Sequence, residues 1–127
     1  MILLDTHTLI WLVREPDELS RKARETIREA AGGLAISAMT LWEVASLAAG
    51  GRLGIHGTIE AFVERMTSRV AIRPVTLQVA ILATQFPSSY PKDPVGKLIG
   101  ATALSEGMTL VTKDRGIRDC KMIKTVW

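Results

Sequence analysis

Short apolar runs alternate along the chain with longer segments in which apolar positions recur at helical spacing. The runs cover residues 1–4, 34–37, 70–72 and 109–112, and a weaker one covers residues 122–126. Apolar runs without alternating polar residues are typical of strands buried on both faces of a parallel sheet. The pattern therefore predicts four strands and a fifth, weaker one, for which Lys124 and Thr125 suit an edge position.

Between these runs, apolar residues spaced three and four apart predict amphipathic helices. One follows Ser20, with Ala23, Ile27, Ala30 and Ala31 on its apolar face. Others are expected over residues 38–49, 59–66, 76–86 and 94–106. Strands that alternate with helices of this length predict an α/β sandwich around a mostly parallel sheet.

Three of the expected helices carry recognisable end signals. Ser20 is a suitable N-cap for the helix that follows it, and Thr58 is a suitable N-cap for the helix over residues 59–66. Asp93 followed by Pro94 opens the helix over residues 94–106, and Gly107 closes it. These signals place the boundaries of the elements independently of their periodicity.

Composition narrows the class of protein. The 127 residues are 47% hydrophobic and 23% charged, which predicts one packed domain over residues 1–127. The lone Cys120 and two histidines exclude an internal disulfide and the usual four-ligand zinc site. No apolar run approaches the roughly 18 residues of a membrane span, and Asp5 interrupts the N-terminal run too early for a signal peptide. We therefore expect a cytoplasmic protein in a reducing compartment, without membrane association.

The charge balance gives a weak indication of a partner. The formal net charge is +3, which is compatible with a polyanionic partner. Three Trp, one Tyr and two Phe are few rings for stacking on bases. Charge alone therefore does not predict nucleic-acid binding.

Acidic residues stand where chemistry is expected in such a fold. Asp5 follows the first predicted strand, and Asp114 follows the strand at residues 109–112. Ligands of parallel α/β sheets bind at the carboxyl ends of the strands, so we expect both side chains at one edge. Glu43 lies on the helix over residues 38–49, which is apolar nearly all round and is expected to be covered on both sides. A carboxylate in such surroundings needs a cation or a cleft.

Convergence of Asp5, Glu43 and Asp114 would predict a metal site. Three anions in one pocket repel each other unless a divalent cation neutralises them. Oxygen ligands favour Mg²⁺ or Mn²⁺. Such a site suits phosphodiester hydrolysis by metal-bound water.

Four segments resemble the PIN-domain family, and within it the VapC toxins of toxin–antitoxin pairs. In order, the segments read LLDTHTLIWL, ISAMTLWEV, KDPVGKLIGATA and LVTKD. The resemblance implies a PIN-like three-layer sandwich with a mostly parallel sheet of four to five strands. It also implies a metal-dependent endoribonuclease in which Asp5, Glu43 and Asp114 bind Mg²⁺ or Mn²⁺ and Thr112 hydrogen-bonds ligand or water. The implied partners are RNA, a second copy of the chain and a VapB-like antitoxin.

The third segment departs from the family pattern. Similar sequences read Asp-Pro-x-Asp-Arg there, and this chain has Gly96 followed by Lys97 at the last two positions. Glycine offers no oxygen ligand and weakens a helix by about 1 kcal/mol relative to alanine. Asp93 is the remaining candidate ligand in this segment, although its place before Pro94 also suits a helix cap. Two outcomes stay open: a weakened nuclease, or an impaired relative that acts only by binding its antitoxin or another partner.

Several residues have plainer interpretations. Asp5 also suits an N-cap, and Asp114 also suits a turn before Arg115. We assign His7 a supporting or packing role, and we expect Trp11 and Trp42 in the core. The basic residues between 21 and 28 are expected on a solvated helix face, with phosphate binding as the alternative.

Two other classes of protein place acids at the strand ends of a small α/β sheet. A phosphoacceptor receiver domain needs an acid pair after its first strand, and here only Asp5 follows it. A haloacid-dehalogenase-type phosphatase needs Asp-x-Asp-x-Thr, whereas residues 5–8 read DTHT. Neither class fits this chain.

Overall fold

A five-stranded parallel sheet forms the centre of the molecule, as seen in a computed structural model that describes residues 1–127. The strand order is β3-β2-β1-β4-β5, and all four neighbouring pairs are parallel. The strands are β1 (Ile2–Leu4), β2 (Leu34–Ser37), β3 (Ala71–Arg73), β4 (Leu110–Val111) and β5 (Thr125–Val126). The predicted strands are confirmed: β2 has the predicted bounds, β3 is shifted by one residue, and β1, β4 and β5 are shorter than predicted. Strand β5 lies at the edge of the sheet as expected.

Seven α-helices and one 3-10 turn connect the strands. They are α1 (Thr6–Arg14), the 3-10 turn (Pro16–Glu18), α2 (Arg21–Arg28), α3 (Ala38–Ala49), α4 (Ile59–Met66), α5 (Leu77–Ala83), α6 (Pro94–Glu106) and α7 (Arg115–Cys120). The side chains of Ser20, Thr58 and Asp93 cap α2, α4 and α6 as predicted. Gly107 ends α6 in the left-handed conformation, with φ 65°, where glycine is favoured.

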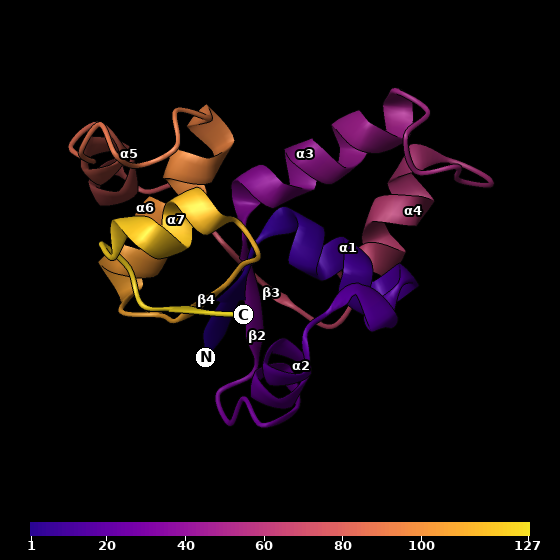
Figure 1. Cartoon of the computed structure of the whole chain (residues 1–127). Helices are drawn as coiled ribbons and strands as arrows, with labels where there is room; N and C mark the ends of the chain where they lie inside the picture. The colour runs from indigo at the N-terminus through magenta and orange to yellow at the C-terminus, as the bar shows by residue number, and fades with distance from the viewer.

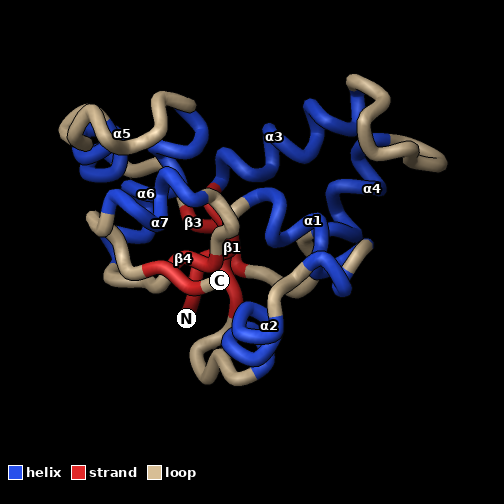
Figure 2. Tube along the Cα trace, viewed as in Figure 1, coloured by secondary structure: helices blue, strands red, loops and turns tan.

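Helices cover both faces of the sheet and give the three layers that the resemblance implied (Figure 1). Leu4 and Ile36 point into one core cluster, which α1, α2, α3 and α4 complete. Leu3 and Ala35, their neighbours in sequence, point into a second cluster on the opposite face, which α6 and α7 complete. This alternation explains why the strands read as continuous apolar runs. Figure 2 shows the strands enclosed between the two groups of helices.

Some expectations about the helices were wrong. Helix α2 ends at Arg28, so Ala30 and Ala31 lie outside it, and α5 is shorter than the predicted segment over residues 76–86. Helix α7 was not predicted, because six residues that include a glycine show no readable period. Sequence patterns predict that a long helix or strand exists more reliably than they predict where a short one begins and ends.

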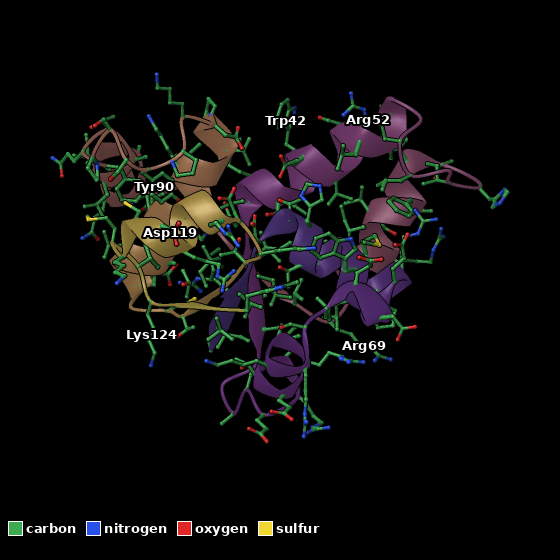
Figure 3. The ribbon with its side chains drawn as sticks, in the orientation of Figure 1. Trp42, Arg52, Arg69, Tyr90, Asp119 and Lys124 are labelled. Atoms are coloured by element: carbon green, nitrogen blue, oxygen red, sulfur yellow. The ribbon has the colours of Figure 1, made fainter.

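The expectation that α3 is covered on both sides was also wrong. Val44 and Ala48 face the core, whereas Trp42 is 60% exposed and points away from the body of the molecule (Figure 3). Trp42 is therefore a surface residue and not a core residue. An apolar composition by itself does not tell whether a second neighbour covers a helix.

No helix of this structure has the length and apolar character needed to cross a membrane.

Candidate active site at the carboxyl edge of the sheet

Asp5 occupies the junction between β1 and α1. Its Oδ1 accepts a hydrogen bond of 2.8 Å from the backbone nitrogen of Thr6, so it caps α1 as well as ending β1. Its Oδ2 accepts a bond of 2.6 Å from the hydroxyl of Thr112, the residue after β4. The contact follows from the sheet register, because Leu4 lies opposite Val111 in the adjacent strand. Thr112 thus orients Asp5 directly.

Burial dominates the electrostatics of Asp5. Desolvation raises the pKa of its carboxyl above the usual 3.8, while the hydrogen bonds from Thr112 and Thr6 act in the opposite direction. The electrostatic interaction with His7 also lowers this pKa, and that with the carboxylate of Asp114 raises it. A cation bound at Asp5 would remove much of the cost of keeping this carboxylate charged.

Asp114 shares an open pocket with Asp5. The pocket has a volume of about 260 Å³, and its other lining residues are His7, Thr8, Trp11 and Lys113. Asp114 is exposed, and its Oδ1 accepts a hydrogen bond of 3.1 Å from the backbone nitrogen of Ile117. It therefore caps α7 and does not merely form a turn. Residues far apart in sequence thus meet at the sheet edge, as their positions after β1 and β4 predicted.

Glu43 and Asp93 are not part of this pocket wall. Glu43 is half-buried on α3, one helical turn after Thr40, whose hydroxyl lies 3.1 Å from that of Thr6. Residues three apart share a helix face, so the face of α3 that carries Glu43 is the one in contact with the start of α1. Asp93 is exposed, and its two carboxylate oxygens accept hydrogen bonds of 3.3 Å from the backbone nitrogens of Val95 and Gly96.

The acidic side chains supply the oxygen ligands that a hard cation prefers, but they do not surround a cation site. No three His, Cys, Asp or Glu side chains lie close enough together to hold a metal ion. Two carboxylates, of Asp5 and Asp114, face one pocket. Mg²⁺ takes oxygen ligands and usually keeps several waters, so one or two carboxylates can bind it. The donor set therefore suits Mg²⁺ or Mn²⁺ held mainly by these two residues.

The buried Tyr90 belongs to the second core cluster, beside the start of α6. Its hydroxyl donates a hydrogen bond of 2.8 Å to the backbone oxygen of Gly96. Burial raises the pKa of Tyr90, and the nearby carboxylates of Asp5, Asp114 and Asp93 raise it further. The phenol therefore stays neutral and acts as a hydrogen-bond donor at the start of α6.

The two glycine positions of α6 differ in how much room they leave for a side chain. A Cβ on Gly100 would collide with the hydroxyl of Tyr90 and lie 2.8 Å from Cδ1 of Ile123. A Cβ on Gly96 would lie 3.4 Å from Oδ2 of Asp93, an ordinary contact. Glycine is needed at position 100 for packing, whereas nothing in the packing explains it at position 96.

Sequence reasoning missed part of the pocket. His7 was assigned a supporting role, and it lines the pocket beside Asp5. Trp11 packs against the first core cluster, in agreement with its expected core position, but it is only half-buried and also forms a wall of the pocket. Its ring centroid lies 5.5 Å from Nζ of Lys113 and 5.7 Å from the ring of His7. The adjacency of Lys113 to Asp114 was the available signal, because two neighbours after one strand reach the same edge.

The fold and the acidic edge define a PIN domain. The model of the PIN-domain family matches residues 2–121, so the chain belongs to this family. Within it, the chain is 38% identical over 128 residues to ribonuclease VapC22 of Mycobacterium tuberculosis, covering 99% of this chain and 98% of that protein.

Solved structures share the fold. A DNA-bound VapBC from Salmonella typhimurium contains a chain with a TM-score of 0.76 and 24% identity, covering 99% of this chain and 98% of that one. A toxin–antitoxin complex from Klebsiella pneumoniae contains one with a TM-score of 0.71 and 22% identity, covering 100% and 97%. The predicted three-layer α/β fold is thereby confirmed.

Proposed function

We propose that this protein is a VapC-like toxin, an endoribonuclease that cuts RNA phosphodiester bonds with the help of Mg²⁺ or Mn²⁺. The observation that carries the proposal is the pairing of Asp5, whose carboxyl is costly to keep charged, with Asp114 in one open pocket. The name of the relative VapC22 as a ribonuclease supports the choice of RNA as substrate. We expect the protein to act in the cytoplasm.

The residues have distinct roles in this proposal. Bound at this site, the cation would activate water for attack and neutralise charge on the phosphate. Asp5 and Asp114 would hold it, and Glu43 would reach it from the contacting face of α3. Asp93 caps α6 and would contribute through water at the edge of the site. Thr112 fixes the rotamer of the Asp5 carboxylate by its 2.6 Å hydrogen bond.

Cleavage of a mixed-sequence RNA, with and without MnCl₂, tests this proposal. The protein should cleave in the presence of the metal and stop when EDTA is added. Asp5→Asn should lose cleavage, while Asp17→Asn, a change of an exposed acid in the 3-10 turn, should not. Equal cleavage by both variants would assign the activity to a contaminating nuclease and refute the assignment of the site.

We also propose a VapB-like antitoxin and a second copy of this chain as partners. The structural relatives described as VapBC or toxin–antitoxin complexes support this choice. Co-expression with the small open reading frame next to its gene, followed by affinity capture and size-exclusion chromatography, should yield one complex. Clean separation of the two proteins would contradict the proposal.

A second candidate function rests on Gly96. Position 96 supplies no carboxylate where similar sequences have one, and no three acids cluster closely. A protein that binds its antitoxin without cutting RNA is therefore the alternative. Restoring cleavage by Gly96→Asp in an otherwise inactive protein would favour this alternative for the natural chain.

A further inference from the structure

A larger, basic hollow lies next to the acidic pocket. It has a volume of about 590 Å³ and opens between α2, α7 and β5, and we name it the basic groove. Lys22, Arg115 and Arg118 line it together with one acid, Asp119, and the indole of Trp127. Figure 3 shows Asp119 on the near side of α7, and Figure 1 shows the chain end between α7 and α2.

The cations of the basic groove are available to a ligand. The two ion pairs of the protein join Arg21 to Glu25 and Arg73 to Glu106, so none of the groove cations takes part in them. Lys22 belongs to the basic run on α2 that was expected to be a solvated face. It is the only member of that run that lines the groove. Three positive side chains against one negative favour an anion.

Aromatic rings connect the basic groove to the acidic pocket. The ring centroid of Trp127 lies 5.7 Å from that of Trp11, which lines the acidic pocket. Arg115 lines the groove and directly follows Asp114, which lines the pocket. A ligand can thus extend from the acids to the groove cations along a wall of two indoles. Positive side chains beside aromatic platforms are how proteins bind single-stranded nucleic acid.

We propose that the basic groove holds the backbone of single-stranded RNA on one side of the bond to be cut. Lys22, Arg115 and Arg118 neutralise its phosphates, and the Trp11–Trp127 wall receives a base. The proposal deepens the proposed function and rests on it for the choice of RNA. An acidic polypeptide would also match the charge, but it would have no use for the indole wall or for continuity with the acidic pocket.

Binding measured in EDTA, where the proposed cleavage stops, tests the groove. The probe is a fluorescein-labelled single-stranded RNA of mixed sequence, followed by anisotropy. Each phosphate contact contributes a salt slope of about 0.7, which corresponds to about fivefold in affinity near 0.1 M salt. Lys22→Ala with Arg118→Ala should therefore weaken binding about 25-fold and reduce the slope of log affinity against log salt by about 1.4.

A charge-matched control separates the groove from general electrostatics. Arg24→Ala with Arg52→Ala removes the same net charge from exposed positions outside the groove, and Figure 3 shows Arg52 at the far end of α3. This pair should change affinity less than twofold. Equal weakening by both pairs, or no weakening by the groove pair, would overturn the proposal. A groove pair that binds RNA normally but loses polyglutamate would also overturn it and identify a protein-docking site.

Tryptophan fluorescence tests the wall formed by Trp11 and Trp127 separately. Trp42→Phe removes the exposed indole and leaves only Trp11 and Trp127 to emit. Saturating RNA should quench that emission, and the groove pair should require more RNA to reach the same quenching. Unchanged emission at saturation would overturn the stacking role of the wall.

Failure of the groove proposal and failure of the nuclease proposal give different results. If no variant cleaves RNA but the groove pair still weakens binding selectively, the nuclease proposal fails and the groove stands. If cleavage depends on Asp5 while the groove pair binds and cleaves normally, the groove proposal fails and the nuclease stands.

Discussion

The acids at the ends of strands and the acids on helices differ in how firmly the fold positions them. Asp5 and Asp114 follow β1 and β4, which are hydrogen-bonded neighbours, and both line one pocket. Glu43 lies on α3 and Asp93 is the N-cap of α6, and neither lines that pocket. The register of the sheet fixes the position of a residue that follows a strand. The position of a residue on a helix also depends on how that helix packs against its neighbours. The strand-end pair is therefore the fixed part of the site, and the helix pair is the adjustable part.

The largest expected effect concerns the fixed part. Asp5→Asn keeps an N-cap acceptor for α1 and removes the carboxylate, so the fold should remain. We expect cleavage to fall at least about 100-fold, the scale of losing a charged group at the reacting centre. Initial rates in MnCl₂, with the melting temperature as a check of folding, measure this. A loss below tenfold would remove Asp5 from the metal site.

The next largest effects are expected from substitutions at the two glycines of α6. Gly100→Ala forces a Cβ against Tyr90 and Ile123 and should destabilise the protein by about 1–3 kcal/mol. A Cβ at position 96 meets only an ordinary contact, but the position is buried and the Cβ lies 3.4 Å from Oδ2 of Asp93. The carboxylate of Gly96→Asp should therefore destabilise the protein in EDTA, regain that stability with Mn²⁺ and increase Mn²⁺-dependent cleavage. Urea denaturation and initial rates measure the two variants. No recovery of stability on adding Mn²⁺, or unchanged cleavage by Gly96→Asp, would mean that position 96 does not face the cation.

Glu43 tests whether the adjustable part joins the site. Glu43→Gln should lower cleavage about tenfold, the lower end of the roughly 10- to 100-fold loss on removing a group that supports a metal site. Glu64→Gln, an exposed acid on α4, is the matched control. If both variants cleave alike, the docking of α3 leaves Glu43 outside the reaction.

Asp93 separates capping from catalysis. Asp93→Ala removes the acceptor for Val95 and Gly96 and should cost about 1 kcal/mol, whereas Asp93→Asn keeps a cap and should cost a few tenths. Thermal unfolding compares the two. Cleavage reduced less than tenfold in Asp93→Asn would agree with a contribution through water, and complete loss would make Asp93 a principal ligand.

The smallest effect is a pH dependence of stability. Since burial raises the pKa of Asp5 in the folded state, its stabilising contribution is full below the unfolded value near 3.8 and is lost as pH rises through the folded value. Asp5→Asn lacks this loss, so in EDTA its melting temperature should gain on the natural protein as the pH rises above the unfolded value near 3.8. A difference in melting temperature that stays constant with pH would mean that Asp5 has no desolvation cost.

The sequence predicted that Asp5 and Asp114 lie at one edge of the sheet, because strands that alternate with helices imply a parallel sheet. That alternation is visible in the spacing of the apolar runs. The exposure of Trp42 was not predictable in the same way, because the pattern of α3 does not tell which neighbours cover it. The basic groove was missed for a related reason. Its walls come from α2, α7 and β5, and only the folded chain brings Lys22 beside Arg118 and Trp127.

The fit of Tyr90 against Gly100 has a consequence for how such a protein changes over evolutionary time. Any side chain at position 100 requires a smaller residue at position 90 and a shift of Ile123, and any smaller residue at position 90 leaves a void beside α6. Each single change should therefore lower the free energy of unfolding. Among descendants of this chain, positions 90, 100 and 123 should change together.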